Sequence, residues 1–312
     1  MSRPDLNAKM QSESNEILIL SGGFSLATFV NFVKKRSRSE NSIKEATLLP
    51  IWRQARREHD ALKTSESTLA EHGELLPLSR SMASMARKAT KQPIFQRSYS
   101  SIPVGFGLVE IDALIALQNH VDLTHTKELS DRLGSKPTDK DIFDFCVPTT
   151  DYKPKLTIHK SGTDRYVIQA ESEDLRYLGS QIIDPNGKID VESDGDVARV
   201  IGLLIGYGSP CINVVRHGTR MVLNNGYHRT YALRQLGFKY IPCVIQAIDH
   251  PEELAFAGGS ELIEDYVDLF QNMRPPLFKD FFNQALTYRI DALRSKTQIQ
   301  ISIDVDSVRV AV

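Results

Sequence analysis

The sequence predicts an α/β or α+β fold, in which a helical N-terminal half precedes a mixed-sheet domain. Residues 43–90 are mostly typical of helices. Short apolar runs rich in strand formers, such as residues 211–216 and 238–245, are bounded by glycine or proline. A third run, residues 221–225, passes through one glycine directly into the helical pattern of residues 227–236. These three observations together predict layers of helix and sheet.

The N-terminal half begins with residues 1–14, which are polar and are expected to form a disordered start. Residues 15–36 are apolar but interrupted at residues 21–23, which predicts a short strand or helix, a glycine turn and a buried helix. This stretch is too short and interrupted to cross a bilayer, and it lacks a basic leader. A short helix is predicted over residues 139–145, and residues 15–150 are expected to form a mainly helical region.

Residues 151–312 are expected to form the second domain, and their pattern predicts both strands and helices. Two strands are predicted within residues 156–178, on either side of a Ser-Gly-Thr turn. An amphipathic helix is predicted over residues 261–270 and another helix over residues 278–293. Apolar residues alternate along residues 298–310, which indicates a terminal strand.

An ordered series of elements lies in the middle of this domain. A helix is predicted over residues 196–205, because apolar residues recur there at helical spacing, and the glycines of residues 206–208 would end it. A proline then opens the strand of residues 211–216. The turn at residues 217–219 joins that strand to an antiparallel partner, residues 220–223.

The turn Gly226-Tyr227-His228-Arg229 is the candidate functional site. A strand that enters a helix through glycine directs backbone N–H groups and the positive end of the helix dipole at one place. Such places bind anions, above all phosphate. His228 adds a proton donor, and Arg229 adds a permanent cation suited to phosphate oxygens. The predicted nucleotide-binding residues are Asn224, Asn225, Gly226, Tyr227, His228 and Arg229.

Residues 194–246 resemble the ParB/sulfiredoxin superfamily. In that superfamily, a helix that ends in glycine precedes a proline-led strand, and a hairpin delivers a Gly-x-x-Arg turn that holds nucleotide phosphates. The resemblance implies that Gly226 is the glycine of the turn and that Arg229 contacts phosphate. It also implies that His228 corresponds to the histidine of the Gly-Cys-His-Arg turn in sulfiredoxins.

Tyr227 departs from the sulfiredoxin pattern, since it stands where those enzymes have their reactive cysteine. A phenol cannot act as a thiolate nucleophile, so the chain is not expected to be a sulfiredoxin. ParB proteins bind and hydrolyse CTP through a turn closer to Gly-Glu-Arg-Arg, and this chain has neither that glutamate nor the first arginine. We expect Tyr227 at the entry of the site, where its ring would cover a base, ribose or substrate.

The leading hypothesis is a nucleotide-dependent enzyme or switch: an NTPase, a phosphotransferase or a ParB-like nuclease, since fold alone selects no reaction. As catalytic residues, Arg229 would neutralise charge that develops during phosphoryl transfer, and His228 would position or protonate an oxygen. The expected cofactor is a nucleoside triphosphate or diphosphate with Mg²⁺, assisted by a carboxylate from Asp190–Asp196. That acidic segment resembles half of a calcium loop, but Ile201 stands where the loop requires glutamate, so no calcium site is predicted there.

Two other function classes stay open. Between Lys34 and Arg97 the chain has 14 Lys and Arg residues against 7 Asp and Glu, a bias that suits DNA but also suits a solvated helical surface. The superfamily implies a DNA-binding or DNA-processing module of bacterial partition, plasmid or defence systems. Alternatively, the chain is a non-catalytic scaffold or homo-oligomer that binds proteins through Trp52 and the apolar residues 15–33.

The turn also has a purely structural interpretation. Asn225 would cap the helix, His228 would bond to a neighbouring strand, and Arg229 would pair with an acidic residue such as Asp190 or Glu192. The chain has three cysteines and no C-x-x-C pair, which fits a reducing cytoplasm, and buried thiols are expected at Cys211 and Cys243, which fall within predicted strands. These cysteines are Cys146, Cys211 and Cys243.

Overall fold

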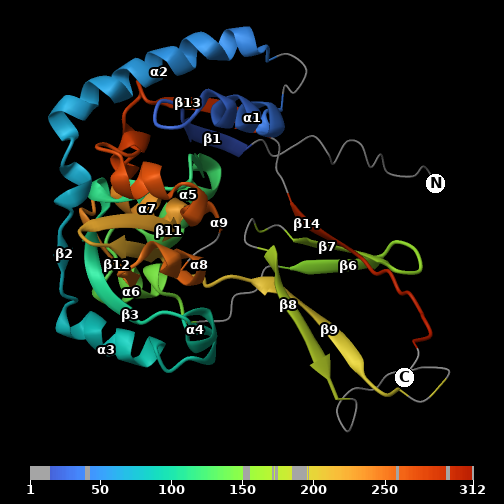
Figure 1. Ribbon diagram of the computed structural model, residues 1–312. Helices are drawn as coiled ribbons and strands as arrows, with labels where there is room; N and C mark the ends of the chain where they lie inside the picture. The colour runs from blue at the N-terminus through green and yellow to red at the C-terminus, as the bar shows by residue number, and fades with distance from the viewer. Residues whose placement is uncertain are drawn as a thin grey trace, which may run out of the picture. The chain divides into compact units, whose positions relative to one another are not determined.

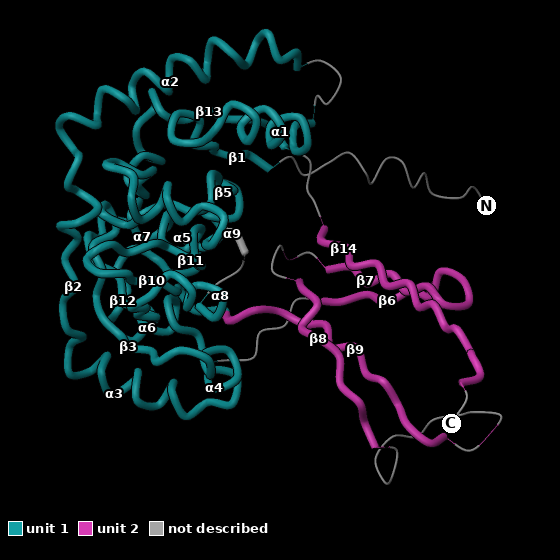
Figure 2. The backbone as a smooth tube through the Cα atoms, in the orientation of Figure 1, with its two compact units in different colours: residues 1–149, 210–294 teal, residues 150–209, 295–312 magenta. Residues whose placement is uncertain are grey.

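A computed structural model of the chain contains two compact units, which Figure 2 colours separately. Unit 1 comprises residues 1–149 and 210–294, and unit 2 comprises residues 150–209 and 295–312. The chain leaves unit 1 near residue 150 and returns to it at Pro210, so residues 151–312 are divided between the two units. The structure describes residues 15–38, 43–149, 155–170, 172, 175–184, 195, 197–257, 260–292 and 296–310.

The chain combines helices with mixed sheets, which confirms the predicted α/β or α+β class. The largest sheet of unit 1 has six strands, seen behind the labels β3, β12 and β11 in Figure 1. In spatial order they are β2 (Leu75–Leu76), β3 (Val104–Glu110), β12 (Tyr240–Ile248), β10 (Asn213–His217), β11 (Arg220–Asn225) and β4 (Ile115–Ala116). The pairs β10–β12 and β4–β11 are parallel, and the other neighbours are antiparallel.

Both faces of this sheet are buried, because apolar residues occupy consecutive positions in its central strands. Val214 and Leu223 belong to the core on one face, and Val215 and Val222 belong to the core on the other. Successive side chains of a strand point to opposite faces, so an uninterrupted apolar run requires cover on both sides. This explains why residues 211–216 and 221–225 could be predicted as strands from composition.

A second sheet of unit 1 has the antiparallel order β13 (Thr287–Ala292), β1 (Asn15–Leu20) and β5 (His120–Asp122). Helices α1 (Leu26–Arg36) and α2 (Glu45–Glu66) pack on it through Phe29, Val33 and Leu48. The predicted strand, glycine turn and helix within residues 15–36 are confirmed.

One prediction about this region is wrong. The helix predicted over residues 278–293 is a short 3-10 helix, Phe278–Phe282, followed by β13. The residues of β13 pair with those of β1, which lies near the other end of the sequence. Much of residues 15–33, which the scaffold alternative assigns to a protein interface, is buried in the core of this region, and Trp52 donates its indole N–H to the carbonyl of Phe24, at 3.0 Å.

The remaining helices of unit 1 surround the two sheets. The predicted helix at residues 139–145 is confirmed, residues 43–90 are mostly helical as predicted, and the helix predicted over residues 261–270 is present as separate turns. These remaining helices of unit 1 are the α-helices α3 (Arg80–Ala89), α4 (Pro93–Ser98), α5 (Leu123–Leu133), α6 (Asp139–Cys146), α7 (Tyr227–Gln235), α8 (Leu254–Ala257) and α9 (Ser260–Glu264), the 3-10 helices η2 (Leu69–Glu71), η3 (Ile111–Ala113) and η4 (Pro251–Glu253), and the π-helical turn Val267–Gln271.

Unit 2 consists of two antiparallel sheets. The three-stranded sheet has the order β14 (Thr297–Ser302), β7 (Arg165–Ala170) and β6 (Leu156–Lys160), and the second sheet pairs β8 (Leu175–Ile183) with β9 (Val200–Tyr207). The predicted strands within residues 156–178 are confirmed. The predicted terminal strand is present but ends at Ser302.

The helix predicted over residues 196–205 is wrong, because Val200–Tyr207 form β9. Its apolar residues pair with β8 instead of packing one face of a helix, and glycines 202 and 206 lower helical propensity. The helix that precedes the proline-led strand in the ParB/sulfiredoxin pattern is therefore replaced here by a strand of unit 2. Within the described ranges, every helix is too short or too polar to span a bilayer.

Candidate functional site

The predicted strand, glycine and helix are present as β11, Gly226 and α7. Gly226 has φ +100°, a left-handed conformation that residues with a Cβ rarely adopt. A Cβ at this position would lie 3.0 Å from the Cα of Ile212 and 2.7 Å from its Cγ1. Only glycine therefore fits between Ile212, which directly precedes β10, and the start of α7, and Gly237, at φ +89°, follows the end of the same helix.

The asparagines before the glycine hold the hairpin together. Asn224 donates from Nδ2 to Oδ1 of Asn213, at 2.8 Å. Asn213 is buried at the irregular first pair of the β10–β11 hairpin, opposite Asn225. These contacts fix the path of the backbone into Gly226, so the position of the turn depends on amide side chains from both strands.

Tyr227 lies in the core, which corrects its predicted place at the entry of the site. The residue is only 4% exposed, and its ring packs against Phe278. Its hydroxyl accepts hydrogen bonds from the N–H groups of Leu117 and Gln118, at 2.6 and 2.9 Å, and donates to the carbonyl of Leu223, at 2.7 Å. Tyr227 thus joins α7 to the segment between β4 and β5 and is not placed to cover a base.

Arg229 reaches the C-terminal end of α6. Its Nη1 donates to the carbonyls of Phe145 and Cys146, at 3.0 and 3.5 Å. A cation at a helix C-terminus satisfies carbonyls that have no partner within the helix and complements the dipole. Arg229 therefore fastens α6 to the first turn of α7. The alternative partners Asp190 and Glu192 lie outside the described residues.

The cysteines around this contact are buried and unsuited to nucleophilic chemistry. Cys146, Cys211 and Cys243 are free thiols in the core, as predicted for the last two. Burial raises the pKa of Cys146 to about 12, against the opposing charge of Arg229. Burial also raises the pKa of Cys243 well above its ordinary value. Neither thiol supplies a thiolate near neutral pH.

His228 lies against His125, a residue that the sequence analysis did not assign to the site. The two imidazoles meet edge to face with their ring centroids 5.3 Å apart. His125 is the third residue of α5 and His228 is the second residue of α7, so the N-terminal turns of the two helices are adjacent. The sequence contains a signal for the start of α5 near His125: Asp122 is a residue type that caps helices, and its side chain accepts a hydrogen bond from the His125 N–H at 2.9 Å.

The two adjacent helix starts differ in their charge. Asp122 neutralises part of the positive end of α5, and Glu128 lies 3.5 Å from Nδ1 of His125. The N-cap residue of α7 is Gly226, which has no side chain, and the first turn of α7 contains no acidic residue. The first hydrogen bond of the α7 ladder runs from the N–H of Thr230 to the carbonyl of Gly226, at 2.9 Å. The N–H groups of residues 227–229 precede that bond, so the first turn of α7 is the more electropositive of the two.

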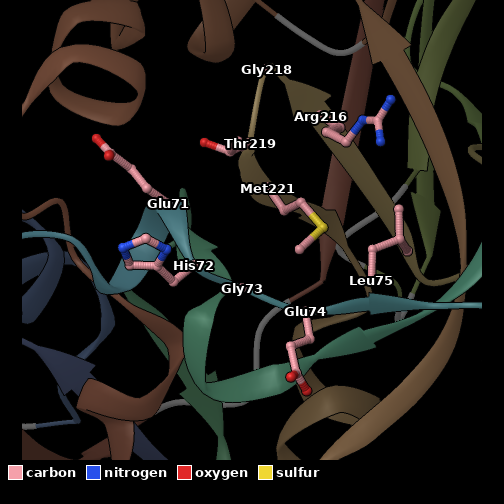
Figure 3. Close-up of a pocket in the computed structure, with 9 residues that line it drawn as sticks. All are labelled: Glu71, His72, Gly73, Glu74, Leu75, Arg216, Gly218, Thr219 and Met221. Carbon is pink, nitrogen blue, oxygen red and sulfur yellow. The ribbon is translucent and has the colours of Figure 1, made fainter.

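An open cleft of about 290 Å³ lies elsewhere on unit 1 (Figure 3). Two of its carboxylates are already paired: Glu71 lies 3.0 Å from the guanidinium of Arg220, and Glu74 bonds to the hydroxyl of Tyr240. The cleft contains none of the predicted site residues. It is lined by Glu71, His72, Gly73, Glu74, Leu75, Arg216, Gly218, Thr219 and Met221.

The predicted contribution of Asp190–Asp196 to magnesium binding falls almost entirely outside the described residues, since only Gly195 of that segment is described. Among the residues that are described, no group of three or more His, Cys, Asp or Glu side chains could hold a metal ion. The chain matches no protein-family model, and neither a curated protein nor a solved structure is significantly similar to it.

Proposed function

We propose that the chain is a nucleotide-binding protein that holds phosphate groups at the first turn of α7. The observation that carries this proposal is a helix start that opens through a left-handed glycine, has no acidic residue in its first turn, and lies beside a second helix start. Backbone N–H groups that precede the helical ladder, together with the dipole, favour a phosphate at such a place. The resemblance to the ParB/sulfiredoxin turn supports a nucleotide over a free anion.

The side chains around this turn take different roles in the proposal. His228 and His125 supply hydrogen-bond donors at the mouth of the turn, and His228 is the residue that would donate to a phosphate oxygen. Arg229 acts through α6, whose last carbonyls it binds, and sets the orientation of the first turn. The ligand would be a nucleoside triphosphate or diphosphate that carries its own Mg²⁺.

Isothermal titration calorimetry with ATP, ADP, CTP and GTP, each with Mg²⁺, tests the proposal. His228→Ala should weaken binding more than about tenfold, since a hydrogen bond to a charged group contributes about 1.5–3 kcal/mol. His250→Ala is the matched control, because its side chain is 65% exposed and lies after β12, outside the turn. The absence of heat and of any thermal shift with all four nucleotides would refute nucleotide binding.

A second function, binding of a nucleic acid backbone, has its own observation. The chain has no Asp or Glu between Glu74 and Glu110, and five basic residues in this interval are exposed. None of the five forms an ion pair within the described chain. Arg87 and Lys91 are seven and eleven residues after Arg80, so the three lie on one stripe of α3 and its C-terminal turn. This stripe is opposite the buried Met82 and Ala86. The five are Arg80, Arg87, Lys88, Lys91 and Arg97.

Fluorescence anisotropy with a labelled DNA duplex at about 50 and 200 mM salt tests this second function, because each phosphate contact makes the affinity depend on salt. The double variant Arg80→Ala/Arg87→Ala should bind more weakly and with a smaller dependence on salt. The double variant Arg53→Ala/Arg57→Ala, which removes two exposed arginines of α2, is the control for net charge. Equal losses in both variants would show that α3 has no specific role.

A further inference from the structure

The ribbon formed by β8 and β9 exposes an unusual amount of apolar surface. Ile182 and Ile201 are direct cross-strand partners, and they are 71% and 72% exposed. Four more large apolar residues of the ribbon, Tyr177, Leu178, Leu203 and Leu204, are also exposed. In the described chain no third strand is hydrogen-bonded to either β8 or β9 (Figure 1). A two-stranded ribbon without further packing is at best marginally stable in water, and among the described residues the unit 2 core packs only against the inner end of this one, through Leu175, Ile205 and Tyr207.

The apolar residues of the outer half of the ribbon occupy both of its faces. The pairs Ser180–Leu203 and Ile182–Ile201 share one face, because they are two residues apart on each strand. The alternating pairs place Leu204 and Ile183 on the opposite face. Apolar side chains on both faces mean that the outer half of the ribbon requires cover on both sides, and exposed apolar patches of this kind mark sites of association.

The ribbon also lacks the features that keep strand edges apart. Residues 177–183 and 200–207 contain no Lys, Arg, Asp, Glu or Pro, and the nearest charge within either strand is Arg176 at the inner end of β8. Natural proteins that avoid edge pairing place lysine, proline or inward-pointing charge on such strands. The backbone N–H and C=O groups along these two uncharged edges can therefore pair with a strand of another chain.

We infer that the outer half of the β8–β9 ribbon is a self-association surface, on which the same ribbon of a second copy of this chain is seated. An uncharged surface offers no electrostatic complement to an acidic or basic partner, whereas two identical uncharged ribbons meet without repulsion. A two-fold arrangement buries Ile182 and Ile201 of both copies at once, since the same patch is used on each side. This surface is independent of the α7 turn and of the interface that composition predicted at Trp52 and residues 15–33.

Sedimentation velocity of the full chain over a range of concentrations tests the inference. The wild-type protein should sediment as a dimer at micromolar concentration, and Ile201→Lys should raise the dimer dissociation constant at least tenfold. Ile158→Lys is the matched control, because Ile158 is 61% exposed on β6 of the same unit but outside the ribbon. This variant should leave the dissociation constant within twofold. A monomeric wild type, or equal dissociation constants for Ile201→Lys and the wild type, would overturn the inference.

Hydrogen exchange separates a true interface from a variant that merely unfolds the ribbon. In the wild type, amides of residues 177–183 and 200–207 should be more protected at high protein concentration than at low concentration. Ile201→Thr, which keeps a β-branched residue in the strand, should retain the circular dichroism spectrum and lose only this concentration dependence. Protection that is independent of concentration, and that disappears on deletion of residues 303–312, would show that the chain's own C-terminal segment covers the ribbon instead.

Discussion

The hydroxyl of Tyr227 lies 2.6 Å from the backbone nitrogen of Leu117, a residue 110 positions earlier in the chain. It also accepts from Gln118 and donates to Leu223, so one phenol satisfies three backbone groups around the start of α7. Tyr227, the residue that departs from the sulfiredoxin pattern, therefore connects α7 to the segment between β4 and β5 through hydrogen bonds. This contact gives the turn of residues 226–229 a fixed place in the fold.

Tyr227→Phe should lower the free energy of unfolding by about 2–3 kcal/mol, because it leaves buried backbone groups without a partner. Tyr227→Ala should cost more, about 3–5 kcal/mol, since it also opens a cavity beside Phe278. Urea unfolding followed by circular dichroism measures both changes. Tyr177→Phe, at a position that is 52% exposed, should stay within about 0.5 kcal/mol. A comparably small effect at Tyr227 would contradict its role in the core.

Gly226→Ala should destabilise the protein more than Gly237→Ala, although the two glycines flank the same helix and both have positive φ. Both substitutions introduce left-handed strain of about 1–2 kcal/mol. Only Gly226 also brings a Cβ within 3.0 Å of the Cα of Ile212, whereas nothing lies within 4 Å of a Cβ at Gly237. Chemical denaturation of the two variants measures the difference, and equal losses would mean that β10 moves freely away from α7.

Arg274→Ala should be among the most destabilising substitutions in unit 1. The Arg274 side chain is fully buried and bonds to both carboxylate oxygens of Asp280, at 2.7 and 2.8 Å, and to Glu66, at 2.8 Å. Removal of one partner from a buried charge cluster costs about 3–5 kcal/mol, because the remaining charge stays desolvated. Arg289→Ala breaks an ion pair with Glu16 at a side chain that is 62% exposed, and should cost less than about 1 kcal/mol. Thermal and urea unfolding of both variants compare the two sites.

Stability should fall between about pH 6.5 and pH 4 because of His59. Burial, assisted by the charge of Arg274, lowers the pKa of His59 from 6.5 to about 4. In this window the unfolded chain binds a proton at His59 and the folded chain does not, so acid favours unfolding by about 1–3 kcal/mol. His59→Leu should flatten the dependence of the unfolding free energy on pH in this range. His250→Gln, at an exposed histidine, should leave the dependence unchanged, and an unaltered slope in His59→Leu would exclude His59 as its source.

Local patterns in the sequence determined the parts of this protein that depend on near neighbours. Apolar runs predicted β10, β11 and β12, and Gly226 predicted the change from strand to helix, because glycine alone tolerates the left-handed conformation there. The same reasoning predicted the strand, turn and helix of residues 15–36. In each case the information lies within a few residues, where alternation, caps and glycine act directly on the backbone.

Only the tertiary structure decided what the side chains of the turn do. Tyr227 and Arg229 bond to residues that are 110 and 84 positions away, and His228 meets a histidine on another helix. The apolar spacing of residues 196–205 suits a helix, but β9 forms because β8 offers a partner strand, and the chain rejoins unit 1 only at Pro210. The spacing of apolar residues along the sequence indicates which side chains are buried. Which surface buries them, and which partner satisfies their polar groups, depends on segments that folding alone brings together.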